Sequence, residues 1–232
     1  MTRSASPGWN PILRWRLKFS RGEELKYISH LDMMRLWERA LRRAALPLAY
    51  SQGFSPHPHI TLASPLAVGV TSEAELADIY ITRPMAPDLF KAAILAQMPR
   101  GIQLLSGHPV HATAPSLPSL VQWAEYKVEV ESNLSQPAIE AAIQALLSAE
   151  IFPWQHRRDT GIHSYDLRAL ISDIKLLQFQ TGTASLWMKV RCGNLGSGRP
   201  EQITAALGFT HQPHSIHRTR LILIGETDES SK

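Results

Sequence analysis

The chain of 232 residues has a single cysteine, Cys192, and its charged residues make up only 19% of the total. One thiol excludes an internal disulfide bond, and it also excludes an iron–sulfur cluster held by this chain alone, because such clusters need several thiolates. No apolar run approaches the roughly 20 residues of a membrane-spanning helix, and the N-terminus lacks the basic and then apolar layout of a signal peptide. We therefore expect a cytoplasmic protein with no membrane partner.

The low charge does not indicate disorder, because 44% of the residues are hydrophobic and can bury a core. A length of 232 residues suits two domains of ordinary size. Arginines (17) far outnumber lysines (7). Nine basic and four acidic residues lie between positions 14 and 50, a local excess of five that is larger than the net charge of +4 for the whole chain. The basic excess is therefore local.

A local arginine-rich segment suits phosphate binding, because the guanidinium fork makes paired hydrogen bonds to phosphate oxygens. Residues 13–19 alternate apolar and basic side chains, which predicts a half-buried strand with Arg14, Arg16 and Lys18 on its outer face. A helix is predicted to begin near His30, after the capping pattern of Ser29 and Asp32, and to end before Pro47. Four arginines recur on one face of this helix: Arg35, Arg39, Arg42 and Arg43. A solvated helix face remains the alternative to a phosphate-binding one.

The remaining patterns predict two successive β-α-β-β-α-β units, so the fold class is α+β with two tandem ferredoxin-like domains. Pro109, Pro115 and Pro118 fall in a segment of small polar residues that is typical of a linker. The predicted boundaries are a flexible tail at 1–11, an N-terminal domain at 12–107, a linker at 108–121, a C-terminal domain at 122–224 and a second tail at 225–232.

The segment "SQGFSPHPHI", residues 51–60, predicts a stiff loop, because Pro56 and Pro58 favour extended backbone. His57 and His59 then point to the same side. Phe54 either anchors the loop in the core or stacks on a nucleobase, and the core is the preferred interpretation. His30 and His57 are candidates for a general acid or base in RNA cleavage, although no catalytic residue is assigned. We predict no metal site, because no carboxylate stands at ligand spacing and His30 belongs to the other end of the helix.

Three further arginines could contact nucleic acid. Arg199 stands in the glycine-rich turn "GNLGSGRPEQ" before a predicted helix, where backbone N–H groups can hold a phosphate. The spacing matches neither a P-loop nor a dinucleotide fingerprint, so a plain turn is the preferred interpretation. Arg218 and Arg220 alternate with Thr219 on the last predicted strand and should share a face. Cys192 has no partner histidine and is interpreted as structural.

The segment "KYISHLDMMRLWERALRRAALPLAYSQGFSPHPHITLASPLAVGV" resembles the opening signature of the radical-SAM-linked protein family, a bacterial domain of unknown function. Farther along, "GSGRPE" and "RTRL" resemble the C-terminal pattern of that family, although Gly198 stands where the family more often has a β-branched residue. The resemblance implies a radical SAM partner of the cobalamin-binding type that carries the cluster, and it implies no cofactor for this chain. It assigns no biochemical activity.

These patterns favour an RNA-binding accessory module that presents RNA to a radical SAM partner for modification, without catalytic activity of its own. Its expected contacts are the four helix arginines with His57, His59, Arg199, Arg218 and Arg220. One alternative is a metal-independent RNA-processing endoribonuclease that uses His30 or His57. Tandem ferredoxin-like domains resemble, at fold level only, the endoribonucleases that process CRISPR repeat RNA. Another alternative is a protein-docking module without an RNA role.

Overall fold

The structure is a computed structural model, and it describes residues 13–52, 54–158, 161–180, 182–193 and 196–226. Its described part contains ten strands and five α-helices, so the predicted α+β class is confirmed. The chain divides into two compact units, Met1–Leu120 and Val121–Lys232. No helix in the described ranges is both long and apolar enough to cross a membrane. The predicted tail at 1–11 and most of the one at 225–232 lie outside the described residues.

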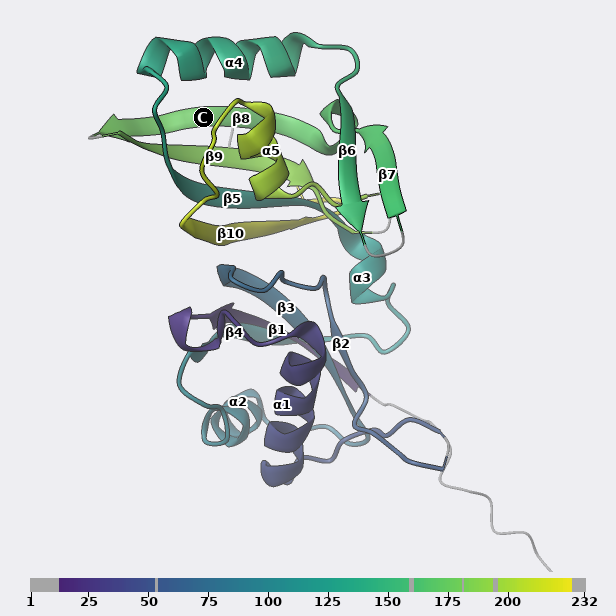
Figure 1. Cartoon of the computed structure of the whole chain (residues 1–232). Coiled ribbons are helices and arrows are strands. Elements are labelled where there is room, and N and C mark those ends of the chain that lie inside the picture. The colour runs from purple at the N-terminus through teal and green to yellow at the C-terminus, as the bar shows by residue number, and fades with distance from the viewer. Residues whose placement is uncertain (1–12, 53, 159–160, 181, 194–195, 227–232) are drawn as a thin grey trace, which may run out of the picture. The chain divides into compact units, whose positions relative to one another are not determined.

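The first unit is a sheet of antiparallel strands covered on one side by helices (Figure 1). Its elements, in chain order, are β1 (Leu13–Arg21), α1 (His30–Arg43), β2 (Ile60–Leu62), β3 (Thr71–Ile81), α2 (Pro87–Leu95), β4 (Ile102–Val110) and α3 (Leu117–Leu120). β1 pairs with β4 on one side and with β3 on the other, and β2 pairs with the far edge of β3. The strand order is therefore β4-β1-β3-β2, and α1 and α2 lie on the same face.

The core of the first unit lies between this sheet and its two long helices. Trp15 and Phe19, on the alternating apolar face of β1, are almost completely buried. Trp15 stacks on Phe90 of α2 with ring centroids 4.5 Å apart, and Phe19 meets Trp37 of α1 edge-on at 5.0 Å. These aromatic contacts fix the helices against the sheet, because each buries a large apolar area in a specific geometry. The outer face of α1 is thereby held in one orientation.

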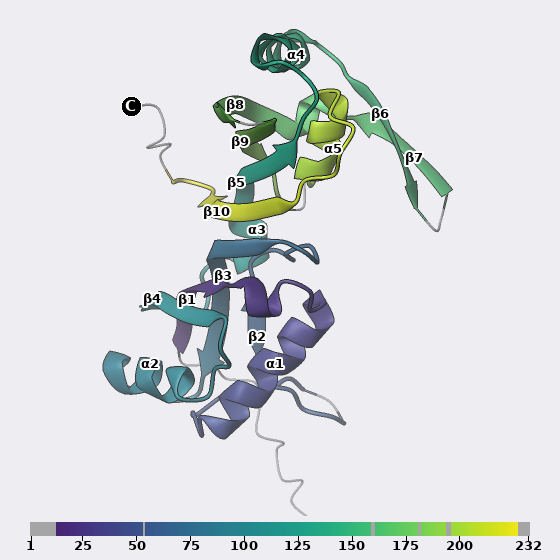
Figure 2. The same cartoon turned by 60° about the vertical axis from the view of Figure 1, so that its left-hand side comes forward.

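The second unit repeats the plan with one addition. Its elements, in chain order, are β5 (Val121–Glu131), α4 (Gln136–Ser148), β6 (Pro153–Arg158), β7 (Gly161–Asp166), β8 (Ile171–Gln180), β9 (Thr183–Arg191), α5 (Pro200–Ala206) and β10 (Ser215–Leu223). The main strands are antiparallel in the order β10-β5-β9-β8. α4 and α5 cover one face of this sheet (Figure 2).

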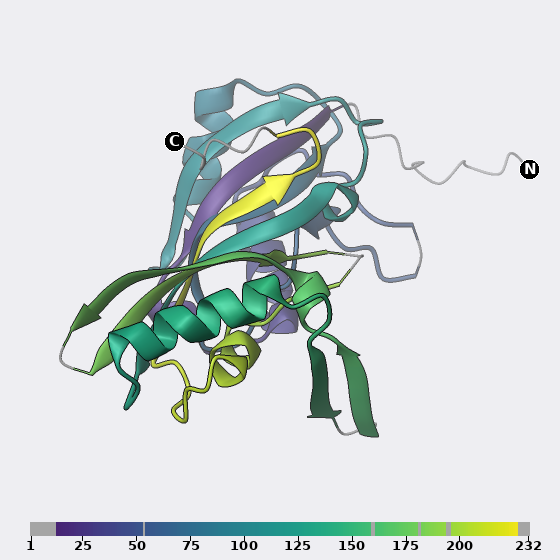
Figure 3. The same cartoon turned by 90° about the horizontal axis from the view of Figure 1, so that it is seen from above.

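β6 and β7 form a separate two-stranded ribbon outside the main sheet. Figure 3 shows this ribbon extending beyond the sheet, next to the end of α4. The Tyr165 hydroxyl at the base of the ribbon donates a hydrogen bond to Gln202 of α5. The sequence indicated only extended pieces here, because a short polar ribbon lacks the apolar alternation of a core strand.

The segment at the end of the first unit differs from the predicted linker. His108, Pro109 and Val110 continue β4 and pair with β1, and Leu117 begins α3 with its side chain fully buried. The irregular connection from β4 to α3 is therefore residues 111–116. Proline at an edge strand is compatible with pairing, because its missing N–H can face solvent.

Candidate nucleic-acid interface

α1 starts where the sequence predicts, at a capped N-terminus. The Ser29 hydroxyl accepts a hydrogen bond from the backbone N–H of Asp32 (3.1 Å) and donates one to the Asp32 carboxylate (2.7 Å). This donation, followed by the contact with Arg35, holds the pKa of Asp32 below its ordinary value of 3.8. The carboxylate also lies at the positive end of the helix dipole. The cap therefore fixes the residue at which α1 begins, and helix periodicity from that residue determines the face on which the arginines lie.

The buried face of α1 consists of Met33, Trp37, Ala40 and Leu41. The helix periodicity places the four arginines within an arc of about 100° on another face, over about 12 Å of helix. All four arginine side chains, at 35, 39, 42 and 43, are exposed. Leu31, an apolar residue of the first turn, is 58% exposed. The prediction of an arginine-rich solvent face is confirmed, and we call it the arginine face (Arg35, Arg39, Arg42, Arg43).

The arginine face is only partly neutralised by its neighbours. Arg35 contacts Asp32 at 3.2 Å in an exposed pair, and Arg43 donates to the side chain and backbone carbonyl oxygens of Gln97 (3.1 and 3.0 Å). Among the described residues, Arg39 and Arg42 make no hydrogen bond or ion pair. The guanidinium groups of Arg39 and Arg42 are therefore available to an external anion. Those of Arg35 and Arg43 can give up their weak surface contacts to bind one.

The 51–58 loop lies against this helix. His57 Nδ1 is 3.3 Å from Oε2 of Glu38, a residue of α1 that the sequence analysis did not single out. Glu38 follows Arg35 by three residues and precedes Arg42 by four, so all three lie on neighbouring positions of the helix surface. This spacing from the two arginines is the signal by which the sequence could have indicated Glu38. The His57 ring is 57% exposed.

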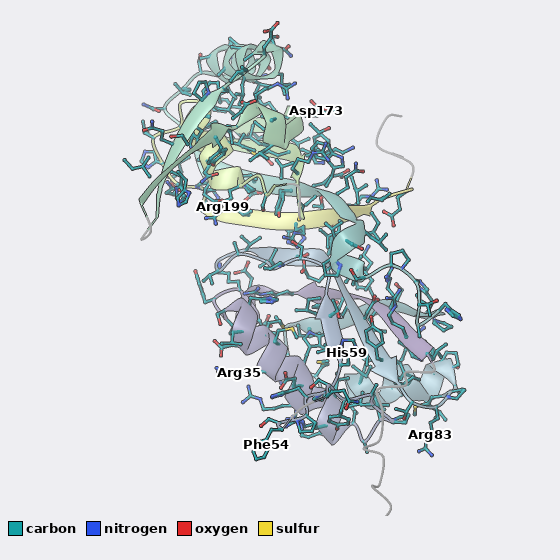
Figure 4. All side chains as sticks on the ribbon, turned by 90° about the vertical axis from the view of Figure 1, so that its right-hand side faces the viewer. Arg35, Phe54, His59, Arg83, Asp173 and Arg199 are labelled. Atoms are coloured by element: carbon teal, nitrogen blue, oxygen red, sulfur yellow. The ribbon has the colours of Figure 1, made fainter. Side chains whose placement is uncertain are left out.

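Phe54 is not in the core. Its side chain is fully exposed, at 105% of the reference accessibility, so the preferred sequence interpretation is wrong. Figure 4 shows Phe54 and Arg35 on the same side of the first unit, with Arg83 on the other side. The core cluster of the first unit includes Leu48 and Ile60, which flank the loop in the chain, and does not include Phe54.

The three histidines of interest do not converge. The His59 ring lies against the Tyr80 ring, with centroids 4.1 Å apart, and burial lowers its pKa from 6.5. In β3, Tyr80 pairs with Arg14, and the preceding residue Ile79 points to the opposite face of the sheet, where it belongs to the core shared with α1. His59 contacts Tyr80 and His57 contacts Glu38 of α1, so the two histidines lie on different sides of the loop. The prediction of a shared side is wrong. His30 lines a cavity of only about 10 Å³, two helical turns from Glu38. No three His, Cys, Asp or Glu side chains of the described ranges are grouped to hold a metal ion.

The predicted basic face of β1 is largely buried. Asp78 of β3 is fully buried between Arg14 (1% exposed) and Arg16 (12% exposed), at 3.3 and 2.9 Å. Arg21 is also buried and donates to three backbone carbonyl oxygens before α1. These arginines neutralise an internal carboxylate and internal carbonyls, so they are not part of a phosphate-binding surface. Sequence alternation could not show this, because the acid lies about 60 residues away in the chain.

The predicted arginines of the second unit are separated. Arg199 is exposed at the N-cap of α5, and part of its glycine-rich turn lies outside the described residues. A β-bulge pairs Arg218 with Tyr126 but Arg220 with Glu125, so the two arginines lie on opposite faces of the sheet and the predicted shared face is wrong. Arg218 is 2% exposed and donates to the Tyr126 hydroxyl. Cys192 is buried, as a structural cysteine should be.

Comparisons with known proteins give one family and several solved structures. A family model described as "Uncharacterized protein conserved in bacteria (DUF2344)" matches residues 14–200. No curated protein matches the chain. Similar solved structures are a crystal structure of a Cbf5–Nop10–Gar1 complex (11% identity, TM-score 0.48), the archaeal box H/ACA sRNP Nop10–Cbf5 complex (12%, 0.47) and an H/ACA RNP bound to a substrate RNA containing 2'-deoxyuridine (12%, 0.46). They cover 94% of this chain, which spans about half the length of each matched chain (55%, 54% and 54%).

Proposed function

The chain belongs to the DUF2344 family of uncharacterized bacterial proteins, and we propose that it is an RNA-binding module that contacts RNA through the arginine face of α1. The observation that carries the proposal is the state of Arg39 and Arg42, which are exposed and have no hydrogen-bond or ion-pair partner among the described residues. Arg35 and Arg43 extend the positive surface on either side. A row of guanidinium groups on a rigid helix can follow a phosphate backbone and release its counterions.

The supporting scaffold is rigid where the surface requires it. α1 is fixed by Trp37 against Phe19 and capped by Ser29, so the four guanidinium groups are presented from a preorganised element. Preorganisation lowers the entropy cost of binding. We further propose that both units are ferredoxin-like split units, with the β6–β7 ribbon as an insertion in the second one. The antiparallel orders β4-β1-β3-β2 and β10-β5-β9-β8 support that assignment.

Salt dependence of RNA binding tests the proposal. We expect Arg39→Gln/Arg42→Gln to weaken binding of a fluorescently labelled RNA and to reduce the slope of log K against log salt by about 1.4, since each lost phosphate contact accounts for about 0.7 on a single strand. Arg83→Gln is the matched control, because Arg83 is exposed on the other side of the first unit (Figure 4). Unchanged affinity and slope in the double variant would reject the arginine face as an RNA contact.

The partner is proposed from the sequence resemblance. We propose that the chain presents bound RNA to a radical SAM protein, which would carry the cofactor chemistry. Co-purification from bacterial cells, with and without ribonuclease treatment, tests this partner. Recovery of an acidic protein that binds through the arginine face, with no bound nucleic acid, would instead support the alternative of a protein-docking module without an RNA role.

The His57–Glu38 pair favours endoribonuclease activity as a second candidate function. Glu38 can orient the His57 imidazole through Nδ1 and leave Nε2 to accept a proton. His57 would take the proton of a ribose 2'-hydroxyl, the 2'-oxygen would attack the phosphorus, and the bond to the 5'-oxygen would break with protonation of that oxygen by water. The products are a 2',3'-cyclic phosphate and a 5'-hydroxyl.

Cleavage in the presence of a metal chelator tests this candidate. We expect His57→Gln to abolish cyclic-phosphate formation and Glu38→Gln to reduce it, while His30→Gln leaves it unchanged because His30 lies two turns away. Intact RNA with the wild-type protein would reject the nuclease and leave the binding proposal untouched.

A further inference from the structure

Phe54 stands at the tip of a loop that the rest of the first unit holds in place. The backbone N–H of Ser51 donates to the carbonyl oxygen of His57 (2.9 Å), and the backbone N–H of His57 donates to the Ser51 hydroxyl (3.1 Å). Tyr50 and Pro58 form a β-bridge below these bonds. The base of the loop is thus closed, and the prolines at 56 and 58 restrict its backbone further.

An exposed phenylalanine at this position is unfavourable for the free protein. Burial of a phenylalanine side chain stabilises a fold, and the first unit forgoes that stabilisation at Phe54. No apolar partner compensates, since the ring is fully exposed. Leu89, another exposed apolar side chain (63%), extends from the helix α2, whereas Phe54 extends from a loop that is closed at its base. An exposed aromatic ring on a loop that is closed at its base is a surface on which a flat ligand group can stack.

The loop and the arginine face belong to one surface. The His57–Glu38 contact attaches the base of the loop to the part of α1 that carries Arg35 and Arg42. Phe54 precedes His57 by three positions, so their Cα atoms are at most about 11 Å apart. A polyanion that follows the arginine face therefore passes within reach of the ring. The ligand that offers both phosphates and flat aromatic groups at that spacing is a nucleic acid strand.

We propose that Phe54 stacks on an unpaired nucleobase of the RNA that the arginine face holds, so that the ligand class is single-stranded RNA or an RNA loop. This inference rests on the proposed RNA-binding function. In a duplex the bases are paired and stacked on each other, and an aromatic side chain cannot reach a base face without opening the helix. Stacking is tolerant of sequence, because every base has a π-face.

The experiment compares a single-stranded oligouridine of about 12 nucleotides, a length that covers a typical single-strand site, with its duplex in the same buffer. Phe54→Ala should weaken binding of the single strand by roughly 5- to 150-fold and leave duplex binding unchanged. The slope of log K against log salt for Phe54→Ala should equal that of the wild type, because the substitution removes no charge. Phe54→Trp should restore the affinity, and Leu89→Ala, which truncates another exposed apolar residue, on α2, should have no effect.

A direct readout comes from 2-aminopurine placed in the single strand. Its fluorescence should fall on binding to the wild type and to Phe54→Trp, and it should stay high with Phe54→Ala. Equal affinities of wild type and Phe54→Ala for the single strand, with a salt slope that still depends on Arg39 and Arg42, would overturn the stacking inference and leave the proposed function intact. Absence of any RNA binding by the wild type would overturn both.

Discussion

Replacing the buried carboxylate Asp78 by asparagine should destabilise the first unit strongly. Asp78 is completely buried, and Arg16 contacts both of its oxygens, through Nε (2.9 Å) and Nη2 (3.0 Å), while Arg14 approaches at 3.3 Å. Asp78→Asn preserves the shape of the side chain but leaves two guanidinium groups without a counter-charge, one of them almost inaccessible to water. Removing one partner of a buried ion pair costs about 3–5 kcal/mol, so we expect a loss of that size in the free energy of unfolding.

Urea unfolding followed by far-UV circular dichroism measures the loss, and amide hydrogen exchange of β1 and β3 reports the first unit separately if the two units unfold in separate transitions. The matched control is Asp32→Asn, which removes the exposed partner of Arg35 at 3.2 Å and should cost far less, because water screens an exposed ion pair. If Asp78→Asn costs no more than the control, the reasoning that burial sets the energy of this cluster is refuted.

Three further changes have defined outcomes. Gly198→Ala should lower the free energy of unfolding by about 1–3 kcal/mol in a urea titration, because its Cβ would lie only 2.8 Å from the Val190 Cβ. Burial lowers the pKa of His59 below 6.5 in the folded protein, so the unfolded chain binds a proton at this residue more readily. The free energy of unfolding should therefore decrease from about pH 7 toward pH 5, and His59→Gln should flatten that decrease. Ser29→Ala should raise the pKa of Asp32 toward 3.8 in an NMR titration, because it removes the hydroxyl donor that lowers this pKa most.

The sequence predicts α1 well because the signals for this helix are local. Ser29 and Asp32 mark its start, and the spacing of Trp37 and Leu41 marks its buried side. The alternation in β1 likewise predicts a strand with one apolar face. These patterns depend only on helix and strand periodicity, which neighbouring residues determine. The ribbon of β6 and β7 is also local, because the two strands are joined by only two residues, but its strands lack the apolar alternation of a core strand and so left only a weak signal.

The candidate surface is harder to predict because exposure depends on distant residues. Arg14 and Arg39 look alike in sequence. Arg14 forms an ion pair with a carboxylate about 60 residues away, whereas Arg39 makes no hydrogen bond or ion pair among the described residues. The separation of Arg218 from Arg220 results from a single inserted residue in the ladder, which strict alternation cannot reveal. Phe54 is a residue type that is usually buried, and only the folded structure shows that its side chain is fully exposed.

The guanidinium of Arg14 also donates to the carbonyl oxygens of Ala114 (3.1 Å) and Pro115 (3.2 Å). These two hydrogen bonds attach the stretch that leaves β4 to the first unit, and a recombinant fragment that stops at residue 107 would lose both acceptors together with the end of β4. A fragment that ends at Leu120 keeps them, and it is the shortest one in which we expect the arginine face and the Phe54 loop to be studied in isolation.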